Sequence, residues 1–196
     1  MTLTRAFDFS DVSGSITMNF RTWYDIEEDY DYLYLLVSTD GESWEMVETP
    51  SGTSDDPTGQ NYGWAYNGLS GGRSQAAWIQ ESIDLSAYAG EEVLVRFEYI
   101  TDAAVNGEGL LLDDVEVPEI NYFSDFEDGD GGWEAAGFVR IQNTLPQTFL
   151  LSLISQDGTT QVERISLSED NGAVVALDFD DVDEYTLVIS GSTRFT

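Results

Sequence analysis

The stretch LYLLVSTDGESWEMV, residues 33–47, decides the fold because it sets two apolar runs on either side of an Asp-Gly pair. Asp40 and Gly41 both accept the positive φ that a tight turn requires, so the stretch predicts a β-hairpin. A hairpin joins two antiparallel strands. The first expectation is therefore antiparallel β-structure around this segment.

Apolar residues recur with a period of two in several other segments. Val93, Val95, Phe97 and Tyr99 form the cleanest example, and polar residues stand between the last three. Such alternation is typical of strands that present one face to a core. We expect further strands at residues 16–20, 79–85 and 110–117. Short strands separated by turns indicate an all-β, antiparallel jelly roll or β-sandwich.

A second, smaller domain is expected after the first. The acidic, glycine-rich segment SDFEDGDGGW follows Pro118 and predicts a domain boundary, with a jelly-roll β-sandwich at residues 1–119. Beyond it, apolar runs at residues 138–141, 149–154, 162–167, 174–179 and 185–189 predict a small β-sandwich domain at residues 120–196. A unit of this size is marginal alone, so we expect it to dock on the first domain.

The charge balance excludes one class of partner. The chain has 196 residues and a formal net charge of −31, and its seven basic residues are all arginine. Nothing here displaces phosphate counterions, so nucleic acid is excluded as an expected partner and anionic membrane surfaces are disfavoured. No apolar stretch reaches transmembrane length. Self-repulsion must be offset either by bound divalent cations or by concentrated salt, as in proteins of salty habitats.

The chain contains neither cysteine nor histidine. This excludes zinc sites built on those residues, the Ser-His-Asp triad and a cysteine nucleophile. Two carboxylates can act in glycoside hydrolysis, but so acidic a chain offers many accidental pairs. We therefore expect no enzyme activity. The N-terminus MTLTRAFDFS lacks the basic start and apolar run of a signal peptide, so a secreted parent would contribute this chain as a mature piece.

Six stretches of the sequence, in this order along the chain, match the pattern of a known protein family. They are WYDIEEDYDY, VSTDGESW, IDLSAYAGEEVLVRFEYITD, GLLLDDVEVPEI, GGWEAAGFVRI and VISGSTRFT. With them the sequence resembles the C-terminal, non-catalytic region of secreted immune inhibitor A metallopeptidases, and its first part is similar to MAM-type jelly rolls. The resemblance implies an extracellular accessory role beside a peptidase domain. None of the family's zinc ligands can be placed on a chain without histidine, so peptidase activity is not implied.

Clustered carboxylates predict a calcium site in the first domain. Acids crowd before the apolar run at residue 32, another follows the strand ending near Tyr99, and two interrupt the apolar run at residues 110–117. Ca²⁺ gathers six to eight oxygen ligands, and an unpaired inward carboxylate is costly. The candidate ligands are Asp25, Glu27, Glu28, Asp31, Asp102, Asp113 and Asp114. One of the last two should point inward with Val115.

The resemblance adds weight to calcium, because jelly rolls of this kind often hold a structural calcium ion. The alternative is that the acids before residue 32 form a solvated loop without an ion.

The long aperiodic connection at residues 50–72 contains three aromatic residues, Tyr62, Trp64 and Tyr66. A loop of this length is usually functional or disordered, so these three are the expected contacts for a glycan or protein ligand. In the alternative, the loop folds back over the sandwich and buries them. The tryptophans in or beside strand patterns, Trp23, Trp44, Trp78 and Trp133, are most simply packing residues.

Two functions follow from these patterns. The leading interpretation is an accessory module of a secreted metallopeptidase, stiffened by calcium and acting in stability, positioning or substrate contact. The alternative is a free-standing glycan-binding or adhesive module on the same scaffold. The fold alone does not choose between them, because sandwich scaffolds support many different sites.

Overall fold

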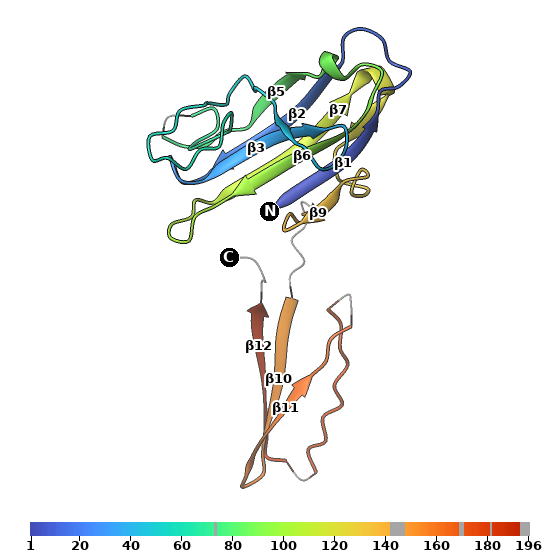
Figure 1. Ribbon diagram of the computed structural model, residues 1–196. Coiled ribbons are helices and arrows are strands. Elements are labelled where there is room, and N and C mark those ends of the chain that lie inside the picture. Colours follow the sequence, from blue (N-terminus) through green and yellow to red (C-terminus); the bar gives the residue numbers. More distant parts are fainter. Residues whose placement is uncertain (73, 142–147, 169–170, 181, 193–196) are drawn as a thin grey trace. The chain divides into compact units, whose positions relative to one another are not determined.

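The computed structural model describes residues 1–72, 74–141, 148–168, 171–180 and 182–192 (Figure 1). These residues form β-strands with two short 3₁₀ turns, which confirms the all-β class. The chain divides into two compact units, Met1–Arg140 and Ile141–Thr196. Within the described residues, no helix has the length and apolar character needed to cross a membrane.

Unit 1 is a sandwich of two antiparallel sheets. The five-stranded sheet has the order β4 (Glu45–Met46), β3 (Tyr32–Ser38), β6 (Glu92–Ile100), β1 (Thr2–Asp8) and β9 (Glu134–Ala136). The four-stranded sheet has the order β5 (Ile79–Asp84), β2 (Thr17–Asp25), β7 (Gly109–Val117) and β8 (Tyr122–Ser124). The 3₁₀ turns are η1 (Ser86–Tyr88) and η2 (Pro118–Ile120).

The alternating apolar residues of β2 and β6 form the core between the sheets. Val93, Val95, Phe97 and Tyr99 are all buried, as the period-two pattern predicts. Phe20 of β2 meets Phe97 edge to face, with ring centroids 5.1 Å apart. Each fully buried apolar side chain of this size contributes about 1.5–3 kcal/mol to folding, so these two faces hold the sheets together.

The hairpin predicted at residues 33–47 is confirmed by the pairing of β3 with β4, but its connection is wider than a two-residue turn. Leu36 pairs with Met46, and residues 39–44 connect the strands. Gly41 adopts a φ of 74°. The carboxylate of Asp40 accepts the backbone N–H groups of Glu42 and Ser43 at 2.8 and 2.7 Å, which stabilises the wider loop.

The long connection between β4 and β5 closes one side of the sandwich. Tyr66 exchanges two backbone hydrogen bonds with Leu33 of the five-stranded sheet. A few residues later, the backbone of Ser70 donates to Tyr24 of the four-stranded sheet. The connection also covers the outer face of β3, so all seven residues of that strand are buried. The loop that sequence periodicity left undefined is therefore an ordered bridge between the sheets.

The division between the units lies later than the sequence suggests. The expected boundary followed residue 119, but β8 pairs with β7 and β9 pairs with β1, so residues 120–140 belong to unit 1. Trp133 is buried against Phe7 and Phe97 of the core. The glycine-rich acidic segment before it is a turn within unit 1, with Gly131 and Gly132 at positive φ.

Unit 2 contains a three-stranded antiparallel sheet. Its order is β11 (Thr160–Ile165), β10 (Thr148–Gln156) and β12 (Glu184–Ser192). The runs at residues 138–141 and 174–179 are not strands. In the described residues of unit 2 this is the one sheet, so the second layer of the expected sandwich is not found among them.

Candidate metal centre

Three acids from two segments meet at one end of unit 1. Glu27 and Asp31 lie in the turn between β2 and β3, and Asp102 follows β6. Each contributes a carboxylate oxygen, and these oxygens lie within 4.8 Å of one another. The sheet brings the segments together, because Tyr32 at the start of β3 pairs with Ile100 at the end of β6. We call Glu27, Asp31 and Asp102 the acidic cluster.

The turn before β3 sets two of these acids on the same side. The N–H of Asp31 donates to the carbonyl of Glu27 at 3.0 Å, which closes a single helical turn with the two residues four apart. Asp29 inside it has a φ of 68°. Asn67 of the long connection clamps the turn, because its Nδ2 donates to the carbonyl of Asp31 at 2.9 Å and its Oδ1 accepts the N–H of Asp29 at 3.2 Å.

Asp31 is the buried member of the acidic cluster. Its side chain is fully shielded from solvent. Oδ2 accepts the hydroxyl of Tyr99 at 2.9 Å, and Oδ1 accepts the backbone N–H of Asp102 at 3.2 Å. Burial, followed by the interactions with Asp31, raises the pKa of Tyr99, so its hydroxyl stays protonated and keeps donating. Each carboxylate oxygen of Asp31 still has a lone pair to offer.

Glu27 supplies the observation that points to a cation. Its Oε2 is buried and has no hydrogen-bond partner among the described residues, although the residue as a whole is only partly covered. Desolvation raises the pKa of Glu27, and the charges of Asp102 and Asp31 raise it further. A shielded, unpartnered carboxylate oxygen beside two other carboxylates is unfavourable unless a positive charge joins them. The cluster therefore fits a hard cation with oxygen ligands.

No arginine reaches the acidic cluster among the described residues. The ion pairs in the described part of the chain lie elsewhere: Arg21 with Asp114, Arg96 with Glu98 and Arg140 with Asp130. The protein's own basic groups in the described part of the chain therefore do not neutralise Glu27, Asp31 and Asp102.

Asp25 and Glu28, also expected as ligands, are not brought into the acidic cluster. Glu28 is exposed on the same turn. Asp25 ends β2, where the backbone of Gly107 approaches its carbonyl so closely that a Cβ there would lie 2.1 Å from the oxygen.

Asp113 and Asp114 occupy a different place from the one expected. The expectation that one of them points into the core is wrong, because the register of β2 with β7 shifts between Asn19 and Arg21 and Asp114 takes a φ of 50°. This β-bulge inserts an extra residue, so both acids stay partly exposed while Val115 is buried. Asp114 Oδ2 lies 3.3 Å from Arg21 Nε. Neither acid joins the acidic cluster.

The three aromatic residues of the long connection have different environments. Tyr62 is 70% exposed, whereas Trp64 is half-buried and donates its Nε1–H to the carbonyl of Thr49 at 3.0 Å. Tyr66 is fully buried, with its ring 5.5 Å from that of Tyr24. The alternative in which the loop folds back therefore applies to Tyr66. Tyr62 is exposed to solvent, so the predicted ligand contact stays a prediction for this residue.

A second buried carboxylate, Glu81 on β5, escaped the sequence analysis. Its Oε1 accepts the hydroxyl of Ser51 at 2.5 Å and its Oε2 accepts the hydroxyl of Tyr66 at 3.1 Å. Burial, and then the charge of Glu81, raise the pKa of Tyr24 to about 12. The period of two contained the signal, because Glu81 stands between Ile79 and the buried Ile83 on the inward side of the strand.

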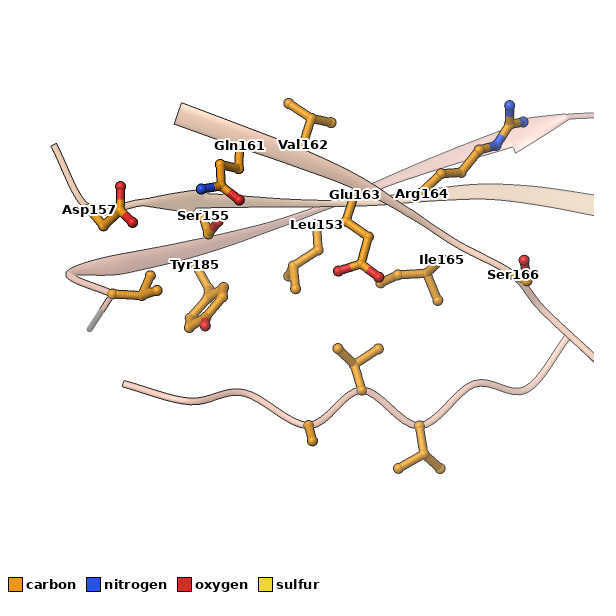
Figure 2. A pocket seen from close by; sticks show the side chains of 14 residues that line it. Leu153, Ser155, Asp157, Gln161, Val162, Glu163, Arg164, Ile165, Ser166 and Tyr185 are labelled. Atoms are coloured by element: carbon orange, nitrogen blue, oxygen red, sulfur yellow. The ribbon is translucent and has the colours of Figure 1, made fainter. Parts of the chain in front are cut away.

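Unit 2 has a cavity of about 650 Å³ between one face of its sheet and the extended segment near residues 174–176 (Figure 2). Leu153, Glu163 and Ile165 point toward it, while Val162 and Arg164 point to the other side of the sheet. No group of three metal-ligating side chains lies there among the described residues. The cavity therefore offers no metal centre comparable with the acidic cluster.

Comparison with known proteins gives one family match and several relatives. Residues 1–143 match the model described as the immune inhibitor A-like MAM domain. Bacillopeptidase F of Bacillus subtilis (strain 168) is 34% identical over 104 residues, which is 53% of this chain and 6% of that protein.

Two further relatives cover more of the chain. The pre-pro-metalloprotease PrtV of Vibrio cholerae serotype O1 (strain M66-2) is 32% identical over 126 residues, which is 63% of this chain and 13% of that protein. Immune inhibitor A of Bacillus thuringiensis subsp. alesti is 28% identical over 143 residues, 72% of this chain and 19% of that protein. The chain thus spans between 6% and 19% of the length of these relatives.

Proposed function

Because the chain belongs to the immune inhibitor A-like MAM domain family, we propose that it is a calcium-stabilised, non-catalytic accessory module of a secreted metallopeptidase. The observation that supports calcium is the buried, unpartnered Oε2 of Glu27 beside Asp31 and Asp102. The accessory role is supported by relatives named as a metalloprotease and as immune inhibitor A, of which this chain matches a small part.

The donor set favours calcium over the commoner alternatives. Zinc in proteins is usually held by histidine and cysteine, and the chain has neither. Magnesium demands near-ideal octahedral geometry, whereas calcium tolerates irregular sets of carboxylates, carbonyls and waters. Glu27, Asp31 and Asp102 would hold the ion, and its charge would offset their mutual repulsion. At an effective dielectric constant of about 20, two like charges about 4 Å apart repel by about 4 kcal/mol.

The position of the acidic cluster suggests what the ion does for the module. Its members come from the turn between the two sheets and from the end of β6, and Asn67 ties the same turn to the long connection. An ion here would join two segments far apart in the sequence, and Asn67 ties a third to them. We propose that it stiffens this end of unit 1 and so holds the surface loops in place for positioning or substrate contact.

The proposal assigns no catalysis to this chain. Peptide hydrolysis would be supplied by an adjoining peptidase domain of a longer, exported protein, and the chain itself lacks the histidine that such zinc sites and serine triads use. We expect the purified chain to leave casein and peptides intact. Cleavage that co-purifies with the chain and disappears when one of its carboxylates is substituted would overturn this part.

Metal analysis combined with thermal unfolding tests the calcium site. At fixed ionic strength, calcium at about a hundred times its Kd adds about 2.7 kcal/mol, which raises the midpoint by roughly 5–10 °C for a unit of this size. An excess of magnesium should give a smaller rise. The Glu27→Gln variant should lose the calcium effect, whereas Glu28→Gln, on the exposed side of the same turn, should keep it.

Screening by salt also quiets repulsion between carboxylates, so the calcium and magnesium samples must have equal ionic strength. Coincident melting curves in calcium, magnesium and chelator, with no bound metal after dialysis, would show that the acidic cluster is a solvated group without an ion.

A further inference from the structure

Three apolar side chains form a row across the four-stranded sheet of unit 1. Trp23 of β2 pairs with Leu111 of β7. On the other side of β2, Thr22 pairs with Ile79, and Trp78 directly precedes Ile79, at the end of β2 where Trp23 lies. We call Trp78, Trp23 and Leu111 the tryptophan row.

The tryptophan row faces away from the core. Both neighbours of Trp23 along β2, Thr22 and Tyr24, are buried, and successive side chains of a strand point to opposite faces. Trp78 is 48% exposed and Leu111 is 37% exposed. Ile79, which follows Trp78, packs against the core instead. Two indole rings and one leucine therefore lie on the outer face of unit 1.

Polar side chains lie in the next row of the same face. Arg21 pairs with Gln80 on one side and with Asp113 on the other. Arg21 uses Nε for its ion pair with Asp114, at 3.3 Å. Its terminal amino groups have no other partner in the described part of the chain. Hydrogen-bond donors and acceptors thus stand directly beside the indole rings.

We propose that the tryptophan row, with Arg21, Gln80 and Asp113, binds a neutral polysaccharide. A pyranose ring carries C–H groups on its faces and hydroxyl groups around its edge. The C–H face packs on an indole ring, and the hydroxyls exchange hydrogen bonds with guanidinium, amide and carboxylate groups in the adjacent row. The formal net charge of −31 repels uronic-acid polymers and other polyanions, so the ligand is an uncharged glycan.

A second protein domain fits this face less well. A stable protein interface buries about 800 Å² on each partner and has an apolar centre. Outside the tryptophan row, the outward residues of β2 and β5 are polar or charged: Thr17, Asn19, Arg21, Gln80, Ser82 and Asp84. Across β2 and β5 the apolar part is thus confined to the tryptophan row, and the exposed Phe123 lies apart from it on β8. The linear form of the row suits an extended chain ligand.

Affinity electrophoresis of the full chain tests the proposal, in gels cast with hydroxyethylcellulose, mixed-linkage β-glucan or galactomannan. At least one polymer should retard the wild type. Trp23→Ala and Trp78→Ala should each weaken binding about tenfold or more, the loss typical of an aromatic anchor. The matched control is Phe123→Ala, an aromatic side chain 58% exposed on β8 of the same sheet and outside the row. It should bind as the wild type does.

A second measurement needs no variant. The chain has five tryptophans, so the indole N–H signals in an NMR spectrum are few enough to assign. Cellohexaose or mannohexaose should shift the signals of Trp23 and Trp78. Those of Trp64 and Trp133, whose Nε1–H groups donate to Thr49 and Tyr122 within unit 1, should stay unchanged.

Three results would overturn the proposal. The first is that none of the three gels retards the wild type. The second is that both tryptophan variants fold and bind with unchanged affinity. The third is that Phe123→Ala loses as much polysaccharide affinity as the tryptophan variants do. If the tryptophan variants bound polysaccharide normally but no longer bound another protein domain, the row would be a protein interface, which also contradicts the proposal. Glu27→Gln should retain polysaccharide binding, because the row is separate from the acidic cluster.

Discussion

Replacing Trp133 by alanine should unfold unit 1 at a much lower temperature. The side chain is 5% exposed and its ring lies 5.9 Å from that of Phe7 and 5.6 Å from that of Phe97. Its Nε1–H donates to the hydroxyl of Tyr122 at 2.9 Å. Truncation of a buried tryptophan costs about 3–5 kcal/mol, so the midpoint should fall by roughly 10 °C or more.

Thermal unfolding and hydrogen exchange of the full chain measure this effect. The loss should appear in the amides of β1 and β6, because Phe7 and Phe97 lie on those strands. Phe123→Ala is the control, since an exposed side chain should change the free energy of unfolding by about 0.5 kcal/mol or less. If Trp133→Ala matched that control and left β1 and β6 protected, residues 120–140 would not belong to the core of unit 1.

Three further predictions concern buried polar groups. In chelator, the midpoint of thermal unfolding should fall as pH rises above about 4.5, because a raised folded-state pKa of Glu27 stabilises the fold only while the carboxyl is protonated. Melting curves recorded from about pH 4 to 7 measure this fall, and either calcium or the Glu27→Gln substitution should remove it. Burial raises the pKa of Tyr24 to about 12, so the stability that its protonated hydroxyl contributes should decline as pH rises from about 10 to about 12. Tyrosinate absorbance from Tyr24 should appear near pH 12 while unit 1 is folded and near pH 10 once it unfolds. Tyr66→Phe removes a hydrogen bond to the buried carboxylate of Glu81 and should lower the free energy of unfolding by about 1.5–3 kcal/mol, whereas Tyr62→Phe at the exposed position should not; equal denaturation curves for the two variants would contradict the role of Glu81.

Alternation along the chain was enough to predict the all-β class, the hairpin at residues 33–47 and the inward faces of β2 and β6. These features depend on the period of two within a strand, which is a local property that neighbouring residues specify together. The same rule placed Phe97 and Tyr99 in the core. The same rule also predicts that Glu81 points inward, because it lies two residues from both Ile79 and Ile83 and so shares their face of the strand.

Alternation failed where one residue interrupts it. The bulge at Asp114 keeps two consecutive acids on the outside, and a strand pattern without the partner strand does not reveal such an extra residue. The tryptophan row was missed for a different reason. Trp23 and Trp78 were interpreted as packing residues, although Trp23 alternates with the buried residues of β2 and so faces outward.

The sequence by itself determined that carboxylates crowd before β3 and that the chain has no histidine, cysteine or lysine to neutralise or replace them. Only the tertiary structure decided which acids meet. Asp102 joins Glu27 and Asp31 because β6 pairs with β3, although it lies 71 residues from Asp31 in the chain. The same holds for Trp133, which completes the core of unit 1 from beyond a glycine-rich turn. Contacts of this kind depend on sheet pairing between distant segments, and no local pattern in either segment encodes its partner.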